Sequence, residues 1–259
     1  MCLIVFALES HPRYPLVLVA NRDEFHDRPT APAAFWADAP KLLAGRDLRA
    51  GGTWLGVTRD GRLATLTYYR EPLPPPPDAP SRGTLAAGFL TGDLAPADYL
   101  AKVAQEDDRF GGYSLLCGDG RGLWYHSNRR KGSLPVTSGI HGLSNGFLDS
   151  PWPKVDRGRE ILANLLAADD LEPAVLAAAL DERQAFHDAL LPDTGFGLER
   201  ERWLSPLYID AGEYGTRSTT VVLLGRDNIL TFYEQSFDAS QQPAGVASFR
   251  FPIVPPDGP

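Results

Sequence analysis

Short apolar runs separated by turn residues dominate the hydrophobic pattern of this chain. Residues 2–8 and 16–20 are rich in aliphatic and β-branched side chains, and the segment 9–15 between them contains serine and two prolines. The two runs therefore predict an antiparallel hairpin in which Leu8 lies opposite Leu16. Continuing that register places Cys2 opposite Arg22, to within a couple of residues.

The same pattern predicts three more hairpins, each with an Asp-Gly or Asp-Asn turn between its two apolar runs. The paired runs are residues 54–58 with 63–69, residues 113–117 with 123–126, and residues 219–224 with 229–233.

Four segments between the hairpins have helical patterns. Residues 81–90 and 96–106 predict two short helices. Ser150 as N-cap and Pro151 as first helical residue predict a third helix that ends near residue 166, and the alanine-rich segment 171–190 predicts a fourth. Hairpins with helices grouped between them predict an α+β fold of layers rather than a doubly wound sheet.

No internal repeat and no change of composition marks a domain boundary, so we expect residues 1–259 to form a single domain. The proline-rich segment 71–80 can form neither a helix nor a strand ladder. It is either a flap over a cleft or a passive surface loop. The tail 252–259 is expected to be loosely held.

Composition narrows the class of protein. A hydrophobic content of 43% with 22% charged residues is typical of a globular chain, and a net charge of −8 argues against nucleic-acid or anionic-membrane partners. The opening apolar run is too short for a signal peptide, and no segment approaches the length of a membrane span. Cys2 and Cys117 lie far apart without metal-ligand spacing, so we expect a cytoplasmic protein with no disulfide framework.

Cys2 is the first candidate for chemistry. Removal of Met1 would place a thiol and a free α-amine, with a pKa of about 8, on one residue, as nucleophilic catalysis requires. Arg22 would lower the pKa of the thiol, and Asp23 would hold the arginine or the amine. Alternatively, Met1 is retained, Cys2 is an ordinary buried strand residue and Arg22–Asp23 is a structural ion pair.

Several motifs together resemble the NRDE family, which includes the transport and Golgi organisation protein two. These motifs lie at residues 1–4, 21–24, 44–57, 66–70, 81–83, 142–146, 152–154 and 214–220. The resemblance implies a fold similar to the N-terminal nucleophile hydrolases, a four-layer αββα sandwich with two antiparallel sheets between helices.

The resemblance also implies roles like those in cysteine amidases of the penicillin V acylase and bile salt hydrolase type. Cys2 would be the nucleophile, Arg22 the cation that stabilises the thiolate, and Asp23 the residue that orients the amine. Asn145 and Arg217 would fill the remaining polar positions. The Ser-Asn-Gly turn at Asn145 can direct a carboxamide at an oxyanion, although asparagine before glycine is also plain turn chemistry. Arg217 can bind an anionic group, pair with Asp23 or remain solvated at a strand end.

Three further residues are candidate substrate contacts. They are Asn21, Trp54, which follows two glycines, and Tyr68. The glycines permit close backbone approach and Trp54 offers a flat apolar surface, although a tight strand entry with a core tryptophan gives the same pattern. Tyr68 stands where the family usually has asparagine. If that asparagine donates to the oxyanion, the Tyr68 hydroxyl or a backbone amide has to replace it.

Two classes of function remain. The first is a hydrolase or acyltransferase that acts on an amide or thioester bond of a small molecule through Cys2, without a cofactor. The second is a non-catalytic binding or trafficking protein for haem or for an acyl-CoA or lipid ligand, which the resemblance implies. Haem would require Cys2 or a histidine as axial ligand, and no histidine lies in a haem-attachment motif. Each histidine is expected instead to be exposed or hydrogen-bonded. The five are His11, His26, His126, His141 and His187.

Overall fold

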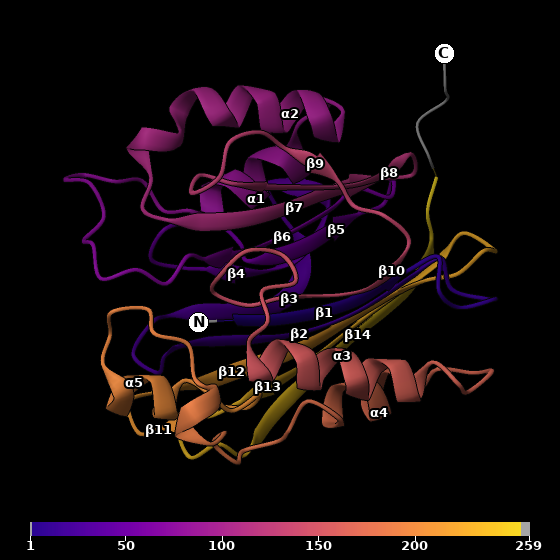
Figure 1. The fold of residues 1–259 in the computed structure, drawn as a ribbon. Coiled ribbons are helices and arrows are strands. Elements are labelled where there is room, and N and C mark those ends of the chain that lie inside the picture. The colour runs from indigo at the N-terminus through magenta and orange to yellow at the C-terminus, as the bar shows by residue number, and fades with distance from the viewer. Residues whose placement is uncertain (1, 255–259) are drawn as a thin grey trace. The chain divides into compact units, whose positions relative to one another are not determined.

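The computed structural model describes residues 2–254, which fall into two compact units. The first unit runs to Asp27 and resumes over Thr137–Phe251, and the second covers Arg28–Val136 together with the chain from Pro252. Each unit contains one antiparallel sheet with its own helices (Figure 1). The predicted α+β class is therefore confirmed.

The sheet of the first unit has the strand order β10-β1-β2-β12-β13-β14, with β11 paired to β12. The predicted first hairpin is confirmed residue for residue, because Leu8 pairs with Leu16 and Cys2 pairs with Arg22. The predicted pairing of residues 219–224 with 229–233 is also found. The strands are β1 (Cys2–Leu8), β2 (Leu16–Phe25), β10 (Gly139–Leu143), β11 (Asp210–Ala211), β12 (Tyr214–Leu224), β13 (Ile229–Phe237) and β14 (Pro243–Pro252).

Helices cover one face of this sheet (Figure 1). Leu3 and Val5 of β1 pack there with Val155 of α3 and Leu176 of α4 in one apolar cluster. Side chains alternate between the two faces of a strand, so Cys2 lies on the face opposite the helices. The helical elements are α3 (Pro153–Leu165), α4 (Pro173–Ala178), the 3₁₀ turn η2 (Asp188–Leu190) and α5 (Leu198–Trp203).

The sheet of the second unit is a meander in which consecutive strands pair, including both hairpins predicted in this region. Leu85 and Phe89 of α1 and Leu100 of α2 pack against Leu42 and Leu115 of the sheet. The strands are β3 (Thr30–Trp36), β4 (Ala39–Asp47), β5 (Leu55–Thr58), β6 (Leu63–Tyr68), β7 (Tyr113–Asp119), β8 (Gly122–Ser127) and β9 (Leu134–Pro135). The helical elements are α1 (Gly83–Thr91), α2 (Pro96–Val103) and the 3₁₀ helix η1 (Ala104–Arg109).

The prediction of a continuous helix over residues 171–190 is wrong. Only α4 and the short η2 form there, and residues 182–187 have no regular structure. Tertiary hydrogen bonds engage the carbonyls that a helix would need. The Asn21 side chain donates to the Leu180 carbonyl, and the backbone N–H of Tyr208 donates to the Glu182 carbonyl. Intrinsic helix propensity is a weak preference that such contacts override.

The predicted start of the third helix is also wrong. The first helical residue of α3 is Pro153, and the residue before it, Trp152, makes no side-chain cap. Ser150 instead accepts a hydrogen bond from the backbone N–H of Phe147, so it closes the preceding turn. A proline does occupy the first helical position, as expected, but it is Pro153 rather than Pro151.

The irregular segments are partly as expected. Residues 71–80 form neither helix nor strand, and the predicted flap remains a prediction. The tail is more firmly held at its start than expected, because Ile253 is buried and the Val254 N–H donates to the Arg59 carbonyl. The rest of the predicted loose tail, residues 255–259, lies outside the described residues. Within the described part, no helix is long and apolar enough to cross a membrane.

The close packing of α3 on β1 gives a test of this architecture. A Cβ atom on Gly158 would lie 2.7 Å from Cγ1 of Val5 and 3.5 Å from Cδ2 of Leu3. Alanine favours a helix over glycine by about 1 kcal/mol. We nevertheless expect Gly158→Ala to lower the free energy of unfolding by about 1–3 kcal/mol through overpacking.

Denaturant unfolding measures this change. The matched control is the double variant Gly158→Ala with Val5→Ala, where the contacted methyl groups are gone and the added cost of the alanine should largely disappear. An equal cost in both backgrounds would show that α3 does not pack on Val5 as described.

Candidate active site at the start of the first strand

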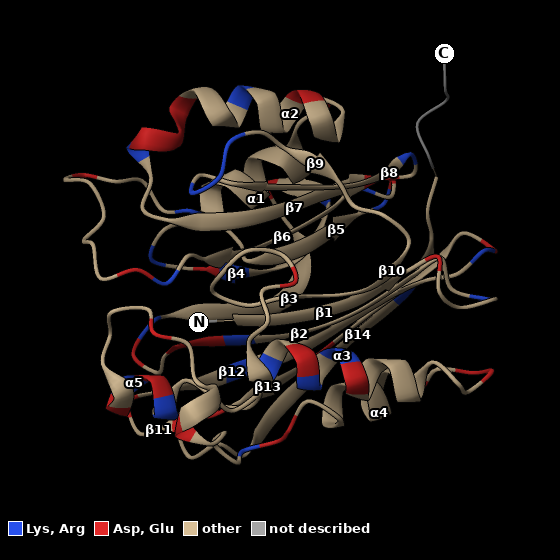
Figure 2. Ribbon diagram, viewed as in Figure 1, with Lys and Arg blue, Asp and Glu red and all other residues tan. Residues whose placement is uncertain are grey.

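A row of polar side chains crosses the sheet of the first unit at the end where β1 begins. Cys2 of β1 pairs with Arg22 of β2, Arg22 pairs with Ser218 of β12, and Ser218 pairs with Ser236 of β13. Paired residues in adjacent strands point to the same face, so the four side chains share the face opposite α3. Figure 2 shows the basic and acidic bands of β2 next to the label of the N-terminus.

Cys2 is partly buried at the start of β1. Burial raises the pKa of the Cys2 thiol, and the Asp23 charge raises it further. A hydrogen bond from the Asp23 backbone and the Arg22 charge act in the opposite direction without reversing this result. Arg22 thus lowers the pKa of the Cys2 thiol as expected, but desolvation of the thiolate outweighs this cation and the pKa is raised overall.

Asp23 is buried and firmly oriented. Its Oδ1 accepts a hydrogen bond of 2.7 Å from Thr216 Oγ1, and its backbone carbonyl accepts one of 2.9 Å from the Tyr214 hydroxyl. Burial raises the pKa of the Asp23 carboxyl, and the charge of Lys154, the Thr216 hydrogen bond and the charge of Arg22 each counteract that effect. The carboxylate thus lies in a site where its charge depends on a few identified neighbours.

Lys154 is a residue of this site that the sequence analysis missed. Its side chain is 2% exposed, and its Nζ donates a 3.0 Å hydrogen bond to the Leu204 carbonyl. It lies in the first turn of α3, where the helix dipole disfavours a cation. A lysine that is both buried and near the start of a helix needs a negative partner, which the field of Asp23 supplies. The unfavourable position was visible in the sequence, in the Trp-Pro-Lys motif at a predicted helix start.

Asn21 has a different environment from the one expected for a substrate contact. Its Nδ2 donates to the carbonyls of Leu180 and Leu207, at 3.2 and 2.9 Å, and its Oδ1 accepts a 2.7 Å hydrogen bond from Thr219. Both ends of the amide therefore bind the protein itself. The side chain ties β2 to two irregular segments of the first unit.

Asn145 lies at the Cys2 end of the sheet. β10 pairs with β1 so that Leu143 lies opposite Ile4, and Asn145 follows two residues later in a buried bend. The neighbouring Ser144 hydroxyl lies 3.0 Å from the Cys2 carbonyl oxygen and 3.4 Å from Asn145 Oδ1. The structure thus brings Asn145 to the backbone of the proposed nucleophile.

Arg217 occupies a β-bulge between Thr216 and Ser218. Thr216, and not Arg217, is the register partner of Asp23. The Arg217 guanidinium donates to the carbonyls of Phe25 and His26, at 2.8 and 3.3 Å. Bulges commonly redirect a side chain at the end of a strand, and here the extra residue reaches back to β2 and the residue that follows it.

Ser218 is a second residue that the sequence analysis missed. Its Oγ is buried and has no hydrogen-bond partner among the described residues. It lies beside Arg22 on the Cys2 face, so its hydroxyl is available to a group bound there. No sequence signal could have placed it on that face, because the bulge at Arg217 changes the alternation of the strand.

Trp54 and Tyr68 belong to the second unit. Trp54 is partly buried, and its ring lies over Gly45, where no side chain would fit. The Arg82 guanidinium lies 5.0 Å from the centre of the Tyr68 ring. Their proposed contact with substrate stays a prediction.

The histidines are hydrogen-bonded within the protein, as expected. Their partners are Ala168 for His11, Gln241 for His26, Asp107 for His126, Asp149 for His141 and Ala189 for His187. Across residues 2–254, no group of three or more histidine, cysteine or acidic side chains is arranged to hold a metal ion.

Two solved structures align with most of this chain at low sequence identity. A Caenorhabditis elegans orthologue of N-acylethanolamine-hydrolyzing acid amidase aligns with a TM-score of 0.49 and 9% identity, over 86% of this chain and 92% of that one. A mutant conjugated bile acid hydrolase from Clostridium perfringens aligns with a TM-score of 0.41 and 8% identity, over 100% and 99% of the two chains.

Comparison of the amino-acid sequence with known proteins identifies the family of this chain. The Mus musculus Transport and Golgi organization 2 homolog is 34% identical over 257 residues, which cover 91% of this chain and 93% of the mouse protein. The Drosophila melanogaster Transport and Golgi organization protein 2 is 29% identical over 264 residues, with 91% and 92% covered. The family model Transport and Golgi organisation 2 matches residues 1–239, which include most of both units. The resemblance expected from the motifs is confirmed, and the chain belongs to the Transport and Golgi organisation 2 family.

Proposed function

We propose that this chain is an N-terminal-cysteine hydrolase or acyltransferase that acts on an amide or thioester bond of a small molecule. Cys2 would be the nucleophile after removal of Met1, a residue that lies outside the described part of the structure. The observation that carries the proposal is the register that sets Cys2 opposite Arg22, with Asp23 next along the strand. Nucleophile, cation and carboxylate are thus delivered by adjacent strands rather than by a mobile loop.

The raised pKa of Cys2 defines how the thiol would be activated. A thiol with a raised pKa stays protonated at neutral pH, so attack requires a base beside it. The α-amine that Met1 removal would free lies on the same residue and has an ordinary pKa of about 8. The thiol proton would pass to this amine as sulfur attacks the carbonyl carbon, and Arg22 would stabilise the negative charge on sulfur.

Asp23 and Asn145 would then act on the two charges that form during attack. The buried Asp23 carboxylate would stabilise the ammonium, with the Thr216 hydrogen bond holding it in place and the charge of Lys154 favouring its ionised form. The Asn145 carboxamide would donate to the oxyanion of the tetrahedral intermediate. The ammonium would return its proton to the leaving amine or thiol, and water or another acceptor would then cleave the acyl-Cys2 thioester.

The direct test is acylation of Cys2. The full chain, produced with a methionine aminopeptidase and checked by intact mass, is incubated with acyl anilides and acyl thioesters of several chain lengths. We expect a mass increase of one acyl group on Cys2, reversed by hydroxylamine, and release of the leaving group.

The controls are Cys2→Ala and a chain with an N-terminal extension, in which the Cys2 nitrogen stays in a peptide bond. Both should be inactive. Equal activity of the extended chain would refute the role of the α-amine. Reversible binding of the acyl compounds by the processed chain without any acylation would favour the alternative hypothesis of a non-catalytic binding protein.

Arg22 can be tested without a substrate. Its charge lowers the pKa of the Cys2 thiol, so Arg22→Gln should raise that pKa further and leave less thiolate at any given pH. Each unit of pKa reduces the thiolate fraction about tenfold. We therefore expect Cys2 to be alkylated by iodoacetamide several-fold more slowly between pH 7 and pH 9, measured in a Cys117→Ala background.

Arg22→Lys is the matched control, because it keeps the positive charge and should retain most of the rate. Cys117 is buried and the pKa of its thiol is well above the usual range, so it should not react in the folded chain. An unchanged rate in Arg22→Gln would show that the guanidinium does not act on this sulfur.

The effect of the Lys154 charge on Asp23 is tested through the pH dependence of turnover. Its charge lowers the pKa of Asp23, so Lys154→Met should raise that pKa and move the acid limb of kcat/KM to higher pH. Lys154→Arg should restore the wild-type profile. A loss of rate at every pH with no shift of the limb would assign Lys154 a purely structural role.

A further inference from the structure

The second unit contains a pocket that the proposed reaction does not use. It has a volume of about 570 Å³ and lies between η1 and the turn that follows β8. Its wall on the η1 side includes Gln105, Asp107 and Asp108, and its wall on the turn side includes Arg130 and Lys131.

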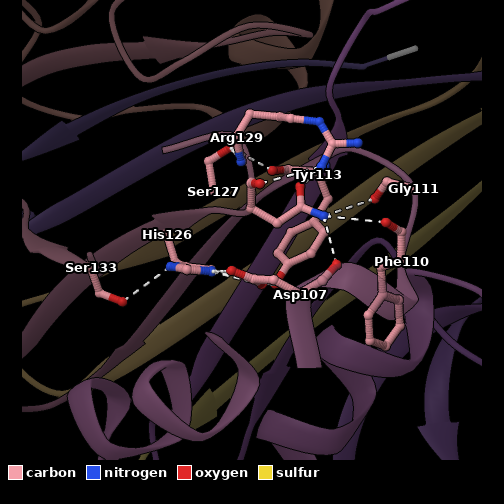
Figure 3. Close-up of polar contacts among 9 residues, drawn as sticks. Asp107, Phe110, Gly111, Tyr113, His126, Ser127, Arg129 and Ser133 are labelled. Carbon is pink, nitrogen blue, oxygen red and sulfur yellow. Dashed lines mark hydrogen bonds and ion pairs between the residues drawn. The ribbon is translucent and has the colours of Figure 1, made fainter. Parts of the chain in front are cut away.

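Partly buried hydrogen bonds hold one side of this pocket in place. Asp107 Oδ1 accepts a 2.5 Å hydrogen bond from the Tyr113 hydroxyl, and its two carboxylate oxygens lie 3.1 and 3.2 Å from Nε2 of His126 (Figure 3). The other ring nitrogen of His126 lies 3.2 Å from the Ser133 hydroxyl. His126 is 1% exposed. The Asp107 carboxylate is thus engaged from two sides by the protein.

The Asn128 side chain joins the two walls. Its Nδ2 lies within 3.4 Å of three carbonyl oxygens, those of Asp107, Phe110 and Gly111, and its Oδ1 accepts a hydrogen bond from the Tyr113 N–H. These bonds hold the end of η1 against the start of the turn (Figure 3). A pocket whose walls are fixed in this way loses little conformational entropy when a ligand binds.

The pocket is lined by the exposed cations Arg130 and Lys131 as well as by the carboxylates of Asp107 and Asp108. Arg129 is engaged by Glu71, to which its Nε donates at 2.7 Å. Arg130 and Lys131 form no ion pair with any described residue, and Asp108 likewise forms none between residues 2 and 254. Figure 2 shows the basic turn beside β9 and the acidic stretch of η1. Arg130 and Lys131 are adjacent in the chain and both exposed, so their charges are accessible to a ligand in the pocket.

We propose that this pocket binds a small ligand that carries a carboxylate or phosphate group together with hydroxyl or amino groups. Arg130 and Lys131 bind the anionic group, because both cations are available and lie on one wall. Asp108 and Gln105 on the opposite wall accept hydrogen bonds from the hydroxyl or amino groups. The pocket lies in the second unit and Cys2 in the first, and the proposal for the pocket does not rest on the proposed hydrolase activity.

Three probes of similar size test this chemistry by calorimetric titration into the full chain at low salt. They are glycerol 3-phosphate, glycerate and uncharged glycerol. We expect saturable binding of at least one charged probe and none of glycerol, and the stronger of the two identifies phosphate or carboxylate as the preferred group. Binding should weaken as salt is raised to physiological ionic strength.

Two double variants with the same change of net charge locate the site. Arg130→Ala with Lys131→Ala should weaken binding by roughly tenfold or more. Arg121→Ala with Lys102→Ala removes two exposed cations outside the pocket and should leave the affinity within about twofold. Cys2→Ala should bind like the wild type. The proposal is overturned if no charged probe binds, if the two double variants lose affinity equally, or if Cys2→Ala abolishes binding.

Discussion

The pairing of β2 with β1 on one side and β12 on the other is the constraint on which the candidate active site depends. Cys2, Arg22 and Ser218 form one row because these two ladders are in register at that level. The turn between β1 and β2 fixes the register of this hairpin, and the Glu9 N–H donates to the Pro15 carbonyl at 2.8 Å where the turn closes. The chemistry of the strand end is therefore specified by the turn at the other end of the hairpin.

Burial sets the electrostatic character of the same strand end. Arg22, Asp23 and Lys154 are each at least 95% buried, with exposures of 5%, 2% and 2%. Charges removed from water are stable only when opposite charges and hydrogen bonds replace the lost hydration. Asp23 has Thr216 for a hydrogen bond and the fields of Lys154 and Arg22 for charge. Such a group of charges loses little by reorganisation when a new charge develops beside it, as catalysis requires.

Much of this arrangement could be predicted from local sequence, and the rest depends on tertiary contacts. The first hairpin was predictable because two short apolar runs are joined by a proline-containing turn, and the length of that turn sets the register. The helix expected over residues 171–190 failed because Asn21 and Tyr208 engage the carbonyls of Leu180 and Glu182 from distant parts of the chain. The direction of the Cys2 pKa could not be deduced either, because the charge of Arg22 is visible in the sequence whereas burial is not.

The β-bulge at Arg217 has a consequence for how this strand end can vary. The residue has no counterpart in β2, so the ladder passes from Thr216 opposite Asp23 to Ser218 opposite Arg22 without it. The pairing on either side therefore does not use the Arg217 side chain, which is left to donate to the Phe25 and His26 carbonyls. A substitution at position 217 should remove these two contacts while Cys2, Arg22 and Ser218 keep their register.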